Sequence, residues 1–530
     1  MKIHILLATL LFAAPALVSA QNDAKDDPAG NLQKFQQFYR YLNGAYVDTV
    51  HNNELVESAI REVLLQLDPH STYVSPEEMV EVKESFDGSF SGIGIEFNVL
   101  RDTIIVVNVI SGGPAEQVGL LPNDRIVAVD GKSSVGVKQI DVPKLLRGPK
   151  GSWVETRIVP HGGGEPLDFT IVRDNIPINT VDAAYKVDPK TGYIRINRFA
   201  NNTYKEFTDA VQKLGPMEAL ILDLRSNGGG LMGGAVQLSN FFLPEGSVIV
   251  STEGMRVPPD RIVAKEDGPF TKGKVIVLIN ETSASASEIV SGAIQDWDRG
   301  VIVGRRTFGK GLVQKPIPLP DGSMIRLTVS RYYTPTGRCI QKPYENGKIE
   351  EYHHDLIDRY NRGELMSADS IHFPDSMKYN TLVTERTVYG GGGIMPDVFI
   401  PVDTTRYTDY HRKLVASGLV NRVSMNYLDR NRNQMMAKYP KFQQYKQDFV
   451  VGEDIMEELL KMAGDEKIEF EEEEYNRSKP LIMLQIKALI ARDLYDMAQY
   501  FQIINDDNPS YQKALQIINN KETYNRLLGR

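Results

Sequence analysis

The sequence predicts an α/β protein of several domains, and three observations along the chain support this prediction. Between residues 180 and 345, short apolar runs alternate with helical patterns, and the run 274–279 is continuously apolar after its lysine. Such strands are typical of sheets that helices cover on both faces. Residues 88–175 instead contain short β-rich runs separated by Gly and Pro. Both ends of the chain show helical periodicity.

The first twenty residues have the pattern of a secretory signal peptide. Lys2 supplies the positive start, residues 5–14 form the apolar core, and Val18-Ser-Ala20 fits a small-x-small cleavage site. An uncleaved membrane anchor is the alternative, but the apolar run is shorter than the ~20 residues that span a bilayer. We therefore expect export to a periplasm with cleavage near Ala20, and at most a peripheral association with a membrane. The single cysteine, Cys339, is compatible with that compartment because it requires no internal disulfide.

Charge and length exclude some classes of function. The net charge is −9 at pH 7, which argues against broad nucleic-acid binding because that needs a basic surface. The length is enough for three or four domains. After the signal at 1–20, the predicted order is a helical segment at 28–87, a small β-domain at 88–175, an α/β core at 176–404 with an insertion at 345–386, and a helical extension at 405–530.

A cluster of serines between small residues is the first candidate site. The stretch Ser283-Ala-Ser-Ala-Ser-Glu-Ile289 follows an apolar strand and opens a helical pattern. Ser285 and Glu288 also match a helix capping box, which is a purely structural interpretation. Both interpretations place Ser285 at a helix N-terminus, where backbone N–H groups point outward and favour negative charge. From the residues alone, Ser283 and Ser287 remain rival nucleophiles, and the Ala286 amide is a candidate oxyanion donor.

Lys310 is the candidate base, because neither motif contains a histidine. It lies in Gly304-Arg-Arg-Thr-Phe-Gly-Lys-Gly311, which has most of a phosphate-binding loop. We reject that loop because position 311 is Gly where a magnesium-binding Ser or Thr is needed, and because an extended run follows. An ordinary solvated loop lysine is the structural alternative. In a partly apolar pocket, desolvation would lower the pKa of Lys310 and allow it to act as a base.

Two glycine-rich turns can present backbone amides to a ligand. Asp223-Leu-Arg-Ser-Asn-Gly-Gly-Gly230 follows a strand, and its amides could contribute to an oxyanion hole, although a plain tight turn is the preferred interpretation when this segment is taken alone. Ser91-Gly-Ile-Gly-Ile-Glu-Phe97 begins the β-domain and could hold a peptide's terminal carboxylate while the peptide adds as a strand. No motif has the spacing of metal ligands. The pair His353-His354 and the acidic run at 469–474 are therefore interpreted as solvated, with no metal or cofactor expected.

Taken together, these motifs resemble the carboxy-terminal processing (tail-specific) serine peptidases that carry a PDZ domain. The resemblance covers about residues 35–402 and rests on motifs that occur in family order: 91–97, 223–231, 283–289, 304–314, Arg331-Tyr-Tyr-Thr-Pro-Thr-Gly-Arg338 and Tyr389-Gly-Gly-Gly-Gly-Ile-Met-Pro-Asp397. It implies a crotonase-like peptidase core with an inserted PDZ domain at 88–175. The helical region after 405 departs from shorter members, which leaves it a role in docking a substrate, an adaptor or a second subunit.

The resemblance also implies roles for individual residues. Ser285 is implied as the nucleophile, Lys310 as the general base and Gln314 as the residue that orients the lysine. The amides of Gly229 and Ala286 are the implied oxyanion hole. Gly228 replaces a proline of many relatives, which puts the choice of glycine in doubt. In the PDZ domain, the substrate C-terminus is implied to bind Gly92, Ile93, Gly94 and Ile95, with Arg147 linking the domain to activation.

We therefore interpret the sequence as an exported serine endopeptidase with a Ser-Lys dyad, acting on proteins with accessible C-terminal tails. The first alternative is a catalytically silent PDZ scaffold or adaptor, against which the intact Ser285 and Lys310 argue. The second is a crotonase-like acyl-CoA enzyme, against which the β-domain, the serine–lysine pair and the export signal argue.

Overall fold

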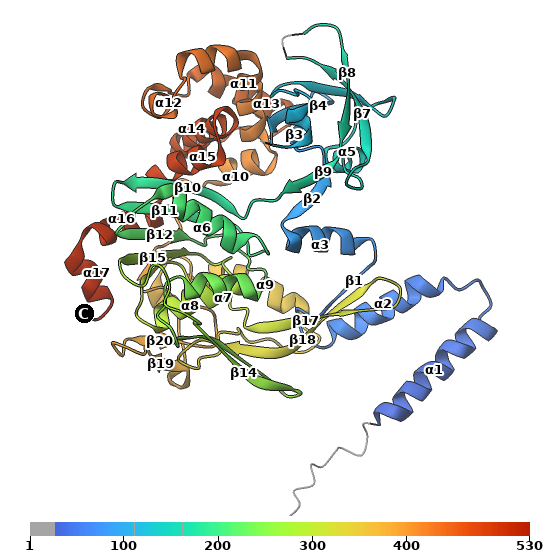
Figure 1. The fold of residues 1–530 in the computed structure, drawn as a ribbon, viewed down its shortest axis with the longest axis vertical. Helices are drawn as coiled ribbons and strands as arrows, with labels where there is room; N and C mark the ends of the chain where they lie inside the picture. Colours follow the sequence, from blue (N-terminus) through green and yellow to red (C-terminus); the bar gives the residue numbers. More distant parts are fainter. Residues whose placement is uncertain (1–26, 111, 162) are drawn as a thin grey trace, which may run out of the picture. The chain divides into compact units, whose positions relative to one another are not determined.

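A computed structural model describes residues 27–110, 112–161 and 163–530, so the predicted signal peptide lies outside the described residues. The described chain forms two compact units, residues 27–62 and 63–530 (Figure 1). The first unit contains α1 (Pro28–Ala45) and most of α2 (Asn52–Leu65). Asp27 caps α1 by accepting a hydrogen bond from the Ala29 N–H at 3.1 Å, and Pro28 fits the first helical position.

The centre of the second unit is a six-stranded sheet, which confirms the predicted α/β class. Its order is β10 (Val181–Asp188), β11 (Thr191–Ile196), β12 (Ala219–Asp223), β15 (Lys274–Ile279), β16 (Val301–Gly304) and β21 (Val398–Phe399). All neighbouring pairs are parallel except β10 with β11. Because side chains alternate along a strand, the two faces of the sheet have separate cores. Leu220 and Leu222 belong to one core, and Ile221 belongs to the other.

Different helices cover the two faces. On the first face lie α6 (Thr203–Leu214), α7 (Met232–Asn240) and α8 (Ala286–Asp296), which bury residues such as Phe207, Leu238 and Ile289. On the second face lie α16 (Pro509–Asn519) and α17 (Lys521–Leu527), which bury Ile517 and Tyr524 against the same strands. The last helices of the predicted extension at 405–530 therefore form part of the core, a contact between distant segments that local periodicity could not reveal.

A second sheet of the core includes the segment that follows Lys310. Its order is β1 (Thr72–Val74), β18 (Met324–Tyr333), β13 (Val248–Gly254) and β14 (Val257–Val263), and β17 (Leu312–Pro318) also pairs with β18. Through β1, the chain segment 68–74 reaches the same sheet as Gln314. The predicted insertion contains α9 (Ile349–Asn361), two short 3-10 turns (Ala368–Ser370 and Asp375–Met377) and β19 (Lys378–Asn380), which pairs with β20 (Thr387–Tyr389).

The β-domain has its own sheet and its own core. The sheet order is β3 (Ile95–Leu100), β4 (Thr103–Val109), β5 (Arg125–Val129), β7 (Trp153–Val159) and β8 (Leu167–Val172), with β6 (Lys132–Ser133) on β5. Its short helices are α4 (Pro114–Gln117) and α5 (Val142–Leu146), with a 3-10 turn at Gln139–Asp141. The chain enters after α3 (Glu78–Asp87) through β2 (Ser89–Gly92) and leaves through β9 (Asp174–Pro177), and these two strands pair with each other.

Six helices after residue 405 share a fourth core, separate from the two on the sheet faces and from that of the β-domain. They are α10 (Asp409–Ala416), α11 (Leu419–Lys438), α12 (Phe442–Asp448), α13 (Glu453–Asp465), α14 (Glu472–Leu494) and α15 (Met497–Ile504), followed by a 3-10 turn at Asn505–Asp507. This helical body contacts the β-domain, where Arg125 pairs with Asp429 at 2.8 Å. None of the helices in the described parts of the chain is long and apolar enough to cross a bilayer.

Candidate active site

Ser285 lies at the N-terminus of α8, directly after the turn that follows β15. Its φ is +55°, a conformation that non-glycine residues rarely adopt and that is often found at functional sites. The side chain is half-buried, so it remains accessible. This position places the hydroxyl beside the partial positive charge of the helix N-terminus. That charge would stabilise negative charge that develops on the serine oxygen or on a group bound to it.

The two rival serines are fully buried and their hydroxyls are already engaged. The Ser283 hydroxyl donates to the Leu224 carbonyl at 2.8 Å, and the Ser287 hydroxyl donates to the Asn227 carbonyl at 2.9 Å. Both hydrogen bonds fasten the serine turn to the Asp223–Gly230 loop. The structure therefore gives Ser283 and Ser287 bracing contacts and leaves Ser285 as the accessible hydroxyl of the cluster.

One buried carboxylate joins the serine turn to the lysine loop. Oε2 of Glu288 accepts the backbone N–H of Ser285 at 2.7 Å and that of Lys310 at 2.9 Å. Oε1 accepts the Thr307 hydroxyl at 2.5 Å and the Gly309 N–H at 2.8 Å. The expected capping contact from Glu288 to the Ser285 N–H is thus present, and the same carboxylate also fixes the loop that carries the candidate base.

A buried phenol makes a second connection between the same two segments. The Tyr332 hydroxyl lies 3.1 Å from the Ser285 carbonyl and 2.5 Å from the Lys310 carbonyl, and it is placed to donate to them. Tyr332 is 2% exposed, so water does not compete for these contacts. Glu288 and Tyr332 together restrict the relative positions of the Ser285 and Lys310 backbones.

The surroundings of Lys310 favour its neutral amine. Burial lowers the pKa of Lys310 below its usual value, and the positive charge of Arg326 lowers it further, against the opposing carboxylates of Glu288 and Asp68. Burial also raises the pKa of Glu288, to about 7, although four donors surround it. A lysine whose ammonium is disfavoured is the kind of group that can accept a proton near neutral pH.

Gln314 lies on β17, opposite Thr328 on β18. Its Nε2 donates to the Thr328 hydroxyl at 3.1 Å, and that hydroxyl donates to Asp68 at 2.9 Å. The segment of Asp68 also brings His70 near Lys310. Burial lowers the pKa of His70 to about 3, with the charge of Lys310 as the next cause. Gln314 is therefore fixed through its amide nitrogen, and its role in orienting Lys310 stays a prediction.

The predicted oxyanion donors have different environments. Gly229 lies against the serine, because a Cβ placed on it would lie 2.7 Å from Cβ of Ser285 and 3.0 Å from the Ala286 nitrogen. Its N–H, however, donates to the side-chain oxygen of Asn227 at 2.9 Å. That asparagine is fully buried, and its Nδ2 donates to the Ile196 carbonyl at 3.0 Å. The Gly229 amide is thus committed to the turn, which does not support its predicted role.

The next amide of the loop is not engaged in the same way. Phe199 and Gly230 form a parallel bridge in which the Phe199 N–H donates to the Gly229 carbonyl and the Leu231 N–H donates to the Phe199 carbonyl. The N–H of Gly230 takes no part in this bridge. Gly230 is therefore an alternative candidate donor, directly after the glycine that lies against Ser285. Ala286 keeps its predicted position at the first turn of α8.

The loop predicted to bind a carboxylate connects β2 to β3 in the β-domain. The Ile93 carbonyl accepts the Ala115 N–H at 2.8 Å, and Gly94 has a φ of +81°, which a glycine adopts without strain. The side chains of Ile93 and Ile95 are buried in the core of the domain. β3 is the end strand of its sheet order, so in the described chain one of its edges has no strand partner, which is the arrangement that strand addition by a peptide requires.

Arg147 lies at the end of α5, beside this loop. Its side chain contacts the position of Gly92, lies 4.2 Å from the centre of the Phe90 ring, and pairs with Glu84 of α3 at 2.9 Å. It therefore connects the β-domain to the helix that precedes β2. This position agrees with a link between the β-domain and the rest of the chain, while a direct contact with a peptide stays a prediction.

Residues 27–110, 112–161 and 163–530 contain no group of three or more His, Cys, Asp or Glu side chains that could hold a metal ion. The roles of Glu288, Tyr332, Asp68 and Asn227 were not foreseen from the sequence. Glu288 had a local signal, because the capping-box pattern marked it, but its contacts with the lysine loop depend on tertiary structure. Tyr332 lies in the motif Arg331–Arg338, but no role was assigned to it, and Asp68 had no comparable signal.

Comparisons with known proteins were made for the whole chain. The sequence pattern of peptidase family S41 matches residues 190–350, and that of the PDZ domain matches residues 91–159. The pattern of the activating protease CtpB N-terminal domain matches residues 12–78, and a family of unknown function matches residues 410–496. The carboxy-terminal-processing protease of Bartonella bacilliformis is 36% identical over 350 residues, which cover 64% of this chain and 80% of that protein. The chain belongs to peptidase family S41.

Other relatives of this S41 peptidase have similar names. The carboxy-terminal processing protease CtpA of Bacillus subtilis is 35% identical over 351 residues, covering 65% of this chain and 74% of that protein. Among solved structures, a photosystem II D1 C-terminal processing protease is 32% identical and covers 58% of this chain and 83% of that one, with a TM-score of 0.34. Family membership confirms the resemblance drawn from the sequence motifs and the prediction that the protein is a peptidase.

Proposed function

We propose that this S41 peptidase is an exported carboxy-terminal processing endopeptidase that uses Ser285 as nucleophile and Lys310 as general base. The observation that supports this most strongly is the position of Ser285, which is accessible at a helix N-terminus and joined to the Lys310 backbone through Glu288. The names of the relatives support the reaction class.

The reaction follows from these positions. Neutral Lys310 takes the proton of the Ser285 hydroxyl as Oγ attacks the peptide carbonyl, and the resulting ammonium gives a proton to the leaving amine. Water then attacks the ester of Ser285, with Lys310 again accepting a proton and returning it to the serine oxygen. The N–H groups of Ala286 and Gly230 stabilise the oxyanion in both steps, because Asn227 already accepts the N–H of Gly229.

Substrates are proteins with an accessible C-terminal tail. The tail adds as a strand to the open edge of β3, with its carboxylate held by backbone N–H groups of residues 92–95. The PDZ match at 91–159 supports this mode of binding. Docking of an adaptor or self-association through the helices after 405 remains part of the proposal, because this region extends beyond the S41 match at 190–350. Lys2, the apolar core at 5–14 and Val18–Ala20 support export to the periplasm.

A degradation assay separates this proposal from a silent scaffold. The purified chain without its first twenty residues is incubated with a disordered protein, with a Ser285→Ala variant as control. We expect fragments with the wild-type chain only. A wild-type chain that binds the disordered protein and leaves it intact would favour the scaffold.

A further inference from the structure

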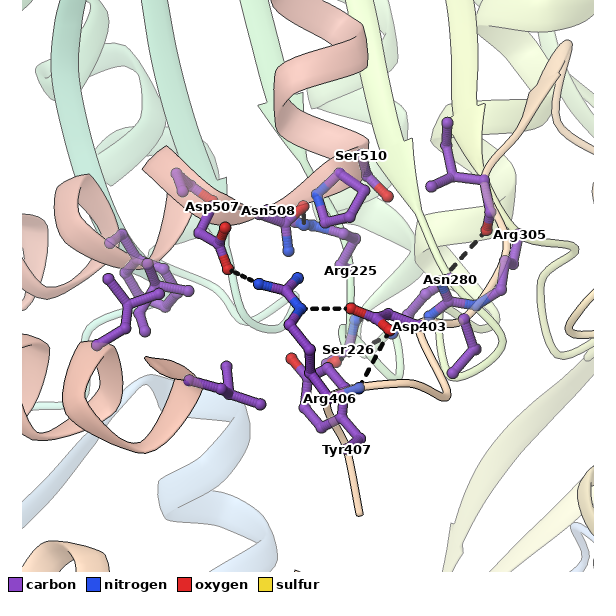
Figure 2. A pocket seen from close by; sticks show the side chains of 18 of the residues that line it. Arg225, Ser226, Asn280, Arg305, Asp403, Arg406, Tyr407, Asp507, Asn508 and Ser510 are labelled. Atoms are coloured by element: carbon purple, nitrogen blue, oxygen red, sulfur yellow. Dashed lines mark hydrogen bonds and ion pairs between the residues drawn. The ribbon is translucent and has the colours of Figure 1, made fainter. Parts of the chain in front are cut away.

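A cavity of about 430 Å³ lies behind the loops of the candidate active site. Ser285 begins α8 on one face of the core sheet, whereas this cavity is lined by the start of α16 on the other face. The loops that follow β12, β15 and β16 supply Arg225, Asn280 and Arg305, and the C-terminal helices supply apolar side chains such as Leu484 and Phe501. Figure 2 shows Arg225 beside Asn508, and Arg406 between Asp507 and Asp403. The active-site loops therefore separate the catalytic side from the C-terminal helices.

Arg225 is the residue through which these helices reach the loop of Gly230. Its Nη1 donates to the side-chain oxygen of Asn508, and its Nη2 donates to that of Asn505 at 3.2 Å. On its other side, Arg225 pairs with the fully buried Asp223 at 2.6 Å. Its guanidinium is thus held between a carboxylate of the core and two amides of the C-terminal region.

The two asparagines are themselves firmly held. Asn508 caps α16 by accepting the Tyr511 N–H at 3.1 Å, and Pro509 occupies the first helical position. Asn505 is 1% exposed, and its Nδ2 donates to the Tyr185 hydroxyl at 2.9 Å. Because both acceptors belong to fixed elements, they restrict where the guanidinium of Arg225 can lie.

The use of amides agrees with the charges around Arg225. Burial alone would raise the pKa of Asp223, but Arg225 and Arg195 outweigh it and hold the pKa of this carboxyl well below its usual value. One ionised carboxylate therefore serves two arginines, and Arg195 also approaches Asp182 at 3.4 Å. The neutral oxygen of the buried Asn505 completes the hydrogen bonds of Arg225 without adding another buried charge, which would be costly, whereas Asn508 is only half-buried.

From Arg225 the chain runs directly into the candidate oxyanion loop. The next residue, Ser226, has a φ of +59°, and its N–H donates to the Asn280 side chain at 2.8 Å. Asn227 then fixes the Gly229 N–H, as described above, and Gly230 follows. Because this turn is short and held by hydrogen bonds, a displacement of Arg225 would also move the N–H of Gly230.

We propose that Asn508 and Asn505 are positioning residues for the peptidase reaction, through which the C-terminal helical region holds the oxyanion loop by way of Arg225. This inference rests on the proposed function, because it takes Gly230 as an oxyanion donor. Asn505 and Asn508 lie beyond the S41 match at 190–350. In this proposal they influence catalysis without contacting the substrate.

Three substitutions at one position test the inference. Asn508→Ser keeps a good helix cap but is too short to reach Arg225, whereas Asn508→Asp keeps both the cap and an acceptor for Arg225. We expect Asn508→Ser to lower kcat on the order of 10-fold with KM nearly unchanged, since misplaced catalytic groups affect the chemical step. Asn508→Asp should restore kcat to within about twofold of wild type. Should Asn508→Ser fail to fold, Asn508→Gly replaces it, because glycine is also tolerated as a cap.

Asn520→Ser is the matched control, because Asn520 caps α17 in the same region by accepting the Thr523 N–H at 2.9 Å. It should leave kcat unchanged. A wild-type kcat in Asn508→Ser, an equal loss in Asn520→Ser, or no recovery in Asn508→Asp would each overturn the inference. Ser285→Ala, measured in the same assay, keeps the two proposals apart. If Ser285→Ala remains active, the dyad fails, whereas an inactive Ser285→Ala with a fully active Asn508→Ser refutes only the positioning role.

Discussion

Ser285 and Lys310 donate their backbone N–H groups to the same carboxylate oxygen, Oε2 of Glu288, at 2.7 and 2.9 Å. The candidate nucleophile and the candidate base are thus positioned by a third residue that lies one turn into the same helix as the serine. This arrangement explains how two loops from different strands keep a fixed relation without a direct covalent or ionic link. It also makes Glu288 sensitive to substitution.

Replacement of Glu288 by Gln should destabilise the fold and lower activity. In glutamine, one carboxylate oxygen becomes an NH₂ group, which cannot accept a hydrogen bond. Two of the four groups that donate to Glu288 would therefore lose their acceptor, at a cost of about 1–3 kcal/mol each. Because burial raises the pKa of Glu288 to about 7, the folded protein binds a proton between pH 4.5 and 7 that the unfolded chain releases. This contribution to stability is present below pH 4.5 and is lost as the pH rises through 7. The free energy of unfolding of Glu288→Gln does not change with pH in this way, because glutamine does not titrate. The difference in this free energy between wild type and Glu288→Gln should therefore shrink from pH 5 to pH 8.

Denaturant unfolding at the two pH values measures this difference. The exposed Glu245→Gln serves as control and should follow wild type at both. A deficit of Glu288→Gln that grows with pH would contradict a raised pKa of Glu288.

The pH dependence of kcat/KM should report the ionisation of Lys310. Activity should rise with pH as the ammonium loses its proton, with a midpoint below the ordinary lysine value of 10.5. Arg326→Gln removes a positive charge that lowers the pKa of Lys310, so its midpoint should shift to higher pH. Arg331→Gln, on the same strand but exposed, should leave the midpoint in place. Identical midpoints in Arg326→Gln and wild type would show that the profile reports another group.

The three serines of the cluster should behave differently when each is replaced by alanine. Ser285→Ala should abolish cleavage and leave the chain folded, at a cost of about 1 kcal/mol, because the hydroxyl loses only its capping contact with the Glu288 N–H. Ser283→Ala and Ser287→Ala should stay active but lose about 1 kcal/mol of stability, because each gives up a hydrogen bond to a buried carbonyl. Turnover and thermal unfolding of the three variants check this. An inactive, well-folded Ser283→Ala would move the nucleophile to that residue.

Binding of a C-terminal tail should depend on its free carboxylate. Peptide binding to the uncleaving Ser285→Ala chain can be followed by calorimetry, once with a free-acid peptide and once with the same peptide amidated. Amidation removes the charge that the loop at 92–95 would hold, so its affinity should be clearly weaker. Equal affinities would exclude carboxylate recognition by this loop.

Local patterns in the sequence were enough to predict the elements around the site. The run 274–279, the helix that starts after Ser285 and the extended segment after Lys310 all occur where periodicity and turn residues placed them. Contacts between distant segments could not be predicted in the same way. α16 covers the core sheet, Tyr332 bridges two loops, and Asn227 takes the Gly229 amide, because tertiary packing and not local spacing decides each of these.

The central claim is that Lys310 activates Ser285 by accepting its proton, and covalent labelling tests it most directly. A fluorophosphonate reacts with an activated serine oxygen, and mass spectrometry of the digested protein locates the adduct. We expect one adduct on Ser285 in wild type and almost none, over the same time, in Lys310→Arg, because a guanidinium keeps the charge but stays protonated. An adduct on Ser283 or Ser287, or equally fast labelling of Ser285 in Lys310→Arg, would contradict the dyad.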